Sequence, residues 1–124
     1  MIDYKTLYNT DPFDKSLNRK NKWFLKNQKK LSLYHYENSK EYRVISDNIF
    51  KPISKVKEIS ELPFIHASAF KNYNIKSIQN NKFLKIFNSS GTSNQKKSQI
   101  NIDPKTSILQ SRALGRIFSN LINK

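Results

Sequence analysis

A Ser/Gly-rich loop between two short apolar segments most constrains how this chain can fold. The first segment is Phe83–Phe87, and in the second, Ser98–Ile102, apolar and polar residues alternate. Both patterns are typical of β-strands. The intervening run, SSGTSNQKK, combines small hydroxyl residues with one glycine and two lysines. Because loops on such scaffolds often bind ligands, this segment is the first candidate for a functional site.

The composition of the loop suits an anion cradle. Gly91 allows positive φ, which turns successive backbone N–H groups toward one side. Hydroxyl groups supply further donors, from Ser89, Ser90, Thr92 and Ser93. Lys96 and Lys97 add positive charge on flexible stems. The Walker pattern GxxxxGK[ST] is absent, and a solvated hairpin turn without a ligand would have a similar composition.

The loop resembles the phosphate loop of adenylate-forming enzymes, [ST]-S-G-[ST]-T-G-x-P-K, which join a carboxylate to AMP. The matches are consecutive over Ser89–Thr92. Asn94 stands at the second glycine of the motif, and Asn tolerates the left-handed region better than most residues. Lys96 stands at the proline. Lys97 aligns with the final lysine, although an alignment that ends the motif at Ser98 is also open.

The flanking segments resemble one branch of these enzymes, the acyl-protein synthetase (LuxE-type) family. Three stretches carry the resemblance: YHYENSKEYRVI at 34–45, LPFIHASAFKNYNIKSI at 62–78 and SQINIDPKTSILQSRAL at 98–114. The resemblance implies activation of a long-chain fatty acid with ATP and Mg²⁺, then transfer of the acyl group to a protein cysteine. It also implies contacts to the ATP phosphates from Ser89, Ser90, Gly91, Thr92, Ser93 and Lys97.

The resemblance implies that only part of the enzyme is encoded here. Relatives carry an adenine-binding strand, a ribose-binding carboxylate and a small lid domain that these residues do not match, and the chain contains no cysteine to accept an acyl group. We therefore expect no catalytic residue and no metal site within it. A split, truncated or decayed synthetase is expected, whose partners would be the remaining part of the enzyme or an acyl-CoA reductase-type protein.

The expected fold is α/β and forms one unit over residues 1–124, an incomplete portion of an adenylate-forming N-terminal domain. Residues 1–83 are predicted to be mainly helical, and residues 84–124 to form strand, phosphate loop, strand and helix. Asp14 is a candidate N-cap for a first helix, and a second helix is predicted from about Leu33 to Ile49. Asp103 and Pro104 predict the start of the last helix. Its apolar stripe comprises Leu109, Ala113, Leu114, Ile117, Phe118 and Leu121.

The formal net charge of +14 raises an alternative, a small basic protein that binds nucleic acid. Residues 51–124 hold thirteen Lys/Arg and three Asp/Glu, so the excess lies mostly in the half that carries the loop. Lysine outnumbers arginine nineteen to four, which argues against base readout. The abundance of Asn and Ile favours a general compositional bias. We expect the basic face of the first helix, with Arg19, Lys22, Lys26 and Lys29, to be solvated.

Nothing in the sequence indicates a membrane or secretory protein. The N-terminus has no signal-peptide pattern, and no segment reaches the roughly 18 consecutive apolar residues of a membrane span. His35 and His66, the two histidines, have no ligand-type neighbours at metal-binding spacing. We expect both to be structural, and the absence of cysteine favours a cytoplasmic protein.

Overall fold

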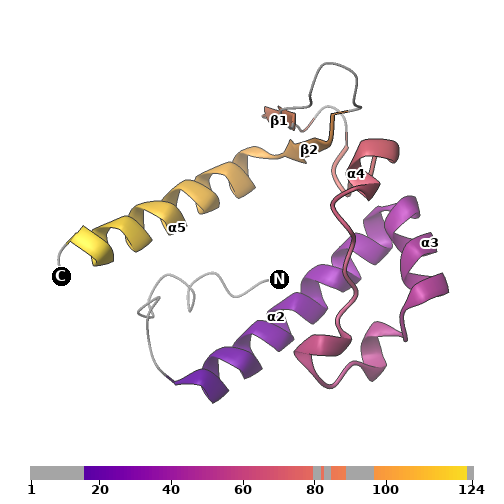
Figure 1. The fold of residues 1–124 in the computed structure, drawn as a ribbon, viewed down its shortest axis with the longest axis horizontal. Helices are drawn as coiled ribbons and strands as arrows, with labels where there is room; N and C mark the ends of the chain where they lie inside the picture. Colours follow the sequence, from indigo (N-terminus) through magenta and orange to yellow (C-terminus); the bar gives the residue numbers. More distant parts are fainter. Residues whose placement is uncertain (1–15, 80–81, 83–84, 89–96, 123–124) are drawn as a thin grey trace.

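The computed structural model describes residues 16–79, 82, 85–88 and 97–122, and every structural statement below refers to these residues. Figure 1 shows how the helices and the small sheet are arranged. The elements are α2 (Leu17–Asn38), α3 (Lys40–Ile49), the 3₁₀ turns η1 (Ile53–Lys55) and η2 (Ile59–Glu61), α4 (Ala69–Asn72), β1 (Lys85–Asn88), β2 (Gln99–Ile102) and α5 (Pro104–Ile122). The described part is thus mostly helical, with one small antiparallel sheet.

One residue, Ser39, separates α2 from α3. Its backbone N–H donates a hydrogen bond to the carbonyl of His35 at 2.8 Å and ends α2, while its hydroxyl accepts the N–H of Tyr42 at 3.3 Å and begins α3. Ser39 is 2% exposed, so few other residues fit there. The prediction of a helix starting near Leu33 was wrong, because residues 33–38 continue the first helix and a serine cap, rather than a change of periodicity, makes the break.

Arg43, which belongs to α3, caps the C-terminal end of α2 with its side chain. Its guanidinium donates to the carbonyls of Tyr36 at 2.9 Å and Glu37 at 3.1 Å, and it lies 5.5 Å from the centre of the Tyr36 ring. The last carbonyls of a helix have no partner within the helix, so a cation from α3 satisfies them. The tight pairing of α2 with α3 in Figure 1 follows from these contacts.

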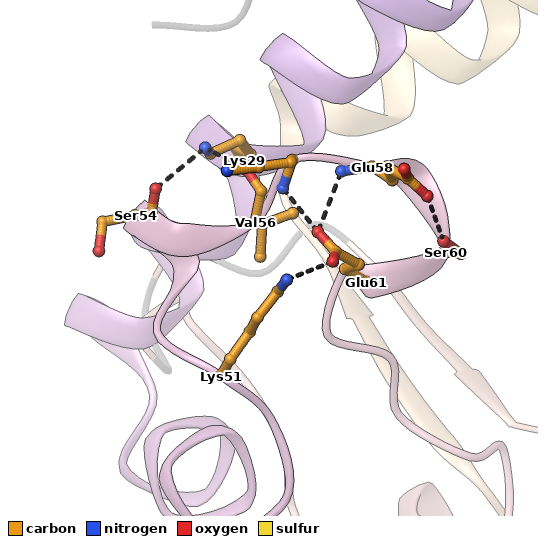
Figure 2. Close-up of polar contacts among 8 residues, drawn as sticks. Lys29, Lys51, Ser54, Val56, Glu58, Ser60 and Glu61 are labelled. Carbon is orange, nitrogen blue, oxygen red and sulfur yellow. Dashed lines mark hydrogen bonds and ion pairs between the residues drawn. The ribbon is translucent and has the colours of Figure 1, made fainter.

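The connection after α3 folds back against α2 and contributes two buried apolar side chains to the small core. Ile53 and Val56 are buried beside the two helices, together with Tyr42 of α3. Lys29 of α2 donates to the carbonyl of Val56 at 2.8 Å, as Figure 2 shows. The prediction that Lys29 is merely solvated was therefore wrong, because its ammonium satisfies carbonyls of the connection. Arg19, Lys22 and Lys26 are exposed, as predicted.

A carboxylate fixes the second turn of this connection. One oxygen of Glu61 accepts the backbone N–H groups of Lys57 at 2.7 Å and Glu58 at 3.1 Å, and the other forms an ion pair with Lys51 (Figure 2). The hydrogen bond from Lys51, followed by those two backbone bonds, lowers the pKa of Glu61 to about 2. The turn that carries Ile59 is thereby held against α2.

The predicted last helix begins where the sequence placed it. Asp103 accepts the backbone N–H of Thr106 at 2.8 Å and its hydroxyl at 3.0 Å, and Pro104 is the first helical residue. A side-chain acceptor at this position stabilises the free N–H groups of the first turn. α5 extends away from the sheet in Figure 1, and none of its side chains is buried.

Candidate phosphate-binding site

The two strands that flank the candidate loop form an antiparallel pair. Lys85 lies opposite Ile102, and Asn88 lies opposite Gln99, so the described parts of the two strands meet at the end where the loop connects them. The predicted strand–loop–strand order is confirmed at the strands. Phe83 and Leu84, which the sequence assigned to the first strand, lie outside the described residues.

Of the predicted phosphate ligands, Lys97 is described and the others are not. Lys97 is exposed and lies two residues before β2. The remaining predicted contacts lie outside the described residues: Ser89, Ser90, Gly91, Thr92 and Ser93. Their assignment therefore rests on the sequence motif, and the structure contributes the scaffold on either side.

One face of the two-stranded sheet carries an exposed apolar pair that the sequence did not predict. Directly opposed residues lie on the same face of an antiparallel pair, so Phe87 and Ile100 share a face, and both are about half exposed. The Lys85 ammonium lies 4.6 Å from the centre of the Phe87 ring, a cation–π contact that keeps this lysine along β1. Sequence reasoning missed this pair because it depends on register.

Two sets of contacts hold the sheet against the helical part. Ile102 is buried at the end of β2, which packs against α4 (Figure 1). Ahead of β1, the hydroxyl of Ser77 shares a hydrogen bond of 2.7 Å with Nδ1 of His35, and its carbonyl accepts the Tyr34 hydroxyl at 3.2 Å. The segment leading into the first strand is thus fixed to the end of α2.

His35 is structural, as the sequence indicated. Its ring centre lies 5.6 Å from those of both Tyr34 and Tyr42, and burial lowers the pKa of the imidazole below its ordinary value. A partly buried ring among aromatic groups favours the neutral form. His66 is exposed, and its Nδ1 shares a hydrogen bond of 2.7 Å with the hydroxyl of Ser68 in the same turn.

Among the described residues, Lys97 is the cation next to the loop in sequence. No group of three or more His, Cys, Asp or Glu side chains is found in this part of the chain. Asp103, the carboxylate nearest to β2 in sequence, is bonded to Thr106 at the start of α5.

Comparison with protein families identifies the chain. The model of the family described as acyl-protein synthetase, LuxE, matches residues 2–123. The chain belongs to this family. The match spans the candidate loop, both strands and α5, in agreement with the resemblance found in the sequence. No curated protein and no solved structure matched the chain.

In this member of the acyl-protein synthetase family, the structure describes the elements on both sides of the candidate loop. β1 and β2 bracket it, and α5 starts immediately after β2 through the Asp103 cap. Arg112 and Arg116 lie one turn apart farther along α5. No helix of the described residues is both long enough and apolar enough to cross a bilayer.

Proposed function

We propose that this chain supplies the phosphate-binding loop of a fatty-acid adenylation site. The observation that carries the proposal is the family match over residues 2–123. The antiparallel pairing of β1 with β2 supports it, since a paired scaffold on both sides limits the conformations open to the loop. The ligand would be ATP, and the second substrate a long-chain fatty acid.

The loop residues act on the leaving group in this proposal. A fatty carboxylate attacks the α phosphorus of ATP, the bond to the bridging oxygen breaks, and pyrophosphate leaves with the electron pair. Backbone N–H groups near Gly91 and the neighbouring hydroxyls donate to the β and γ phosphates. The Lys97 ammonium adds positive charge as negative charge develops on the pyrophosphate. Fixed donors of this kind lower the barrier because they need no reorganisation during the reaction.

Mg²⁺, when bound with ATP, would neutralise phosphate charge in the same step. The phosphate oxygens themselves supply most of its ligands in such a complex. The chain contains no cysteine, so the thiol that accepts the acyl group lies outside these 124 residues. The remaining part of the synthetase would contribute the groups that bind adenine and ribose, and an acyl-CoA reductase-type partner would receive the acyl group.

Replacement of the central glycine tests the role of the loop. We expect Gly91→Val to lower fatty-acid-dependent ATP–pyrophosphate exchange by roughly tenfold or more in the assembled enzyme, because a β-branched residue resists positive φ and displaces N–H donors. A Lys96→Ala/Lys97→Ala double variant should lower exchange as well. The matched control is Lys82→Ala, which removes an exposed lysine ahead of β1. Normal exchange in the Gly91 variant would refute the assigned role.

A further inference from the structure

Ser77 is bound at two points to the C-terminal end of α2, although its partners lie 42 and 43 residues away in the sequence. Its hydroxyl shares the hydrogen bond of 2.7 Å with Nδ1 of His35, and its carbonyl accepts the Tyr34 hydroxyl at 3.2 Å. The His35 ring also lies 5.6 Å from the ring of Tyr42 in α3, centre to centre. Because the packing of α2 and α3 already orients the ring, little further ordering is needed to bind Ser77.

The chain between Ser77 and β1 is too short for the strand to move far from this point. β1 begins at Lys85, eight positions after Ser77. Eight residues span at most about 28 Å when fully extended. The N–H of Lys82 donates to the carbonyl of Gln79 at 3.0 Å, and this turn takes up part of that reach. The position of Ser77 therefore restricts the position of β1.

The small sheet depends on its attachments to the helical part. Each strand has four residues, and an isolated two-stranded sheet is only marginally stable in water. β2 ends in Ile102, whose side chain is buried, and β2 packs against α4. In β1 all four residues are exposed. Burial thus helps to hold β2, whereas β1 is held by its pairing with β2 and by the segment that Ser77 fixes.

The candidate loop inherits the stability of this pairing. Asn88 lies opposite Gln99, and the loop connects the two strands at that end. While the strands stay paired, the two ends of the loop keep a fixed separation. A loop with fixed ends has fewer conformations to lose when it closes around a ligand, so the ligand binds more tightly.

We propose that Tyr34, His35 and Ser77 form an anchor, hereafter the Ser77 anchor, that keeps β1 paired with β2 and so positions the phosphate loop. His35 and Ser77 are then positioning residues, since they act on the loop through the sheet. The ligand of the loop rests on the proposed function. The anchor itself stands on the two contacts to Ser77, the short connection to β1 and the lack of buried side chains in β1.

Hydrogen exchange of the full chain tests the anchor without any ligand. Ser77→Thr and Ser77→Val have side chains of nearly equal shape, and only threonine keeps the hydroxyl. We expect the hydrogen-bonded amides of β1 and β2 to exchange at least about fivefold faster in Ser77→Val than in Ser77→Thr, because a partly buried hydrogen bond is lost. Ser77→Thr should stay close to the unmodified chain, and amides of α3 should exchange equally in both variants.

A second pair of variants tests the Tyr34 hydroxyl. Tyr34→Phe removes the donor to the Ser77 carbonyl and should raise the same β1 and β2 exchange rates by about twofold or more. The matched control is Tyr36→Phe, which removes a tyrosine hydroxyl of α2 that donates to Asp47 at 2.9 Å in α3. It should leave the sheet unchanged. Equal sheet exchange in Ser77→Thr and Ser77→Val, or an equal rise in α3, would overturn the anchor.

ATP–pyrophosphate exchange by the assembled enzyme tests the link to the loop. We expect Ser77→Val to raise the KM for ATP at least about threefold over Ser77→Thr, while the KM for the fatty acid stays within about twofold. A general loss of stability would not separate the two substrates in this way. Equal KM values for ATP would overturn the positioning role. If the unmodified enzyme showed no exchange at all, the proposed function would fail, and the exchange rates of the sheet amides would still decide the anchor.

Discussion

At the scale of single residues, the contact between His35 and Ser77 joins the helical part of the chain to the segment that leads into β1. Nδ1 of His35 and the Ser77 hydroxyl lie 2.7 Å apart, in a setting formed by Tyr34 and Tyr42. Burial lowers the pKa of His35 from its ordinary value of 6.5. Protonation therefore costs more in the folded chain than in the unfolded chain, and this makes the contact sensitive to pH.

The sign of this dependence gives a prediction. Stability from neutral His35 is fully present above pH 6.5 and is lost as the pH falls below 6.5 through the lowered pKa of the folded state. We expect the free energy of unfolding, measured with urea, to decrease from pH 7.5 to pH 5.5 in the unmodified chain and to decrease less in His35→Gln. His66→Gln is the matched control, since His66 is exposed, and should keep the original slope. Identical slopes for all three proteins would contradict the assignment.

At the scale of elements, the start of α5 depends on Asp103. Its carboxylate accepts two hydrogen bonds from Thr106 immediately after β2. We expect Asp103→Ala to lower the free energy of unfolding by about 1 kcal/mol, because the first turn of the helix loses its acceptor. Asp103→Asn should retain most of the stability, since its amide oxygen can still accept. Thermal unfolding followed at 222 nm compares the three proteins. An Asp103→Ala variant as stable as the unmodified chain would show that the cap contributes nothing.

Some of these elements could be predicted from the sequence alone, and others could not. The two strands and the start of α5 were predicted because their signals are local: alternation, a Gly-containing loop and an Asp-Pro step. The α2–α3 boundary was missed because the apolar periodicity runs through residues 33–38, and Ser39 becomes a cap only when it is buried. The prediction that Lys29 is solvated was wrong because the carbonyls that accept its hydrogen bonds lie on a segment 25 to 27 residues away in the sequence. The ligand assignments of Ser89–Ser93 stay a prediction, since these residues lie outside the described part.

At the scale of the whole molecule, the buried side chains are unevenly distributed among the described residues. α2, α3 and the connection share a core that includes Tyr42, Ile53 and Val56. α5 buries no side chain and extends from the small sheet (Figure 1). Local opening is easiest where few apolar contacts must be broken. The free chain should therefore have a stable helical part and a last helix of lower stability.

Hydrogen exchange tests this division. In the free chain, we expect amides in the middle of α5 to exchange at least about tenfold faster than amides of α3 near Tyr42, because opening α5 exposes little apolar surface. Equal protection of α5 and α3 would contradict this division.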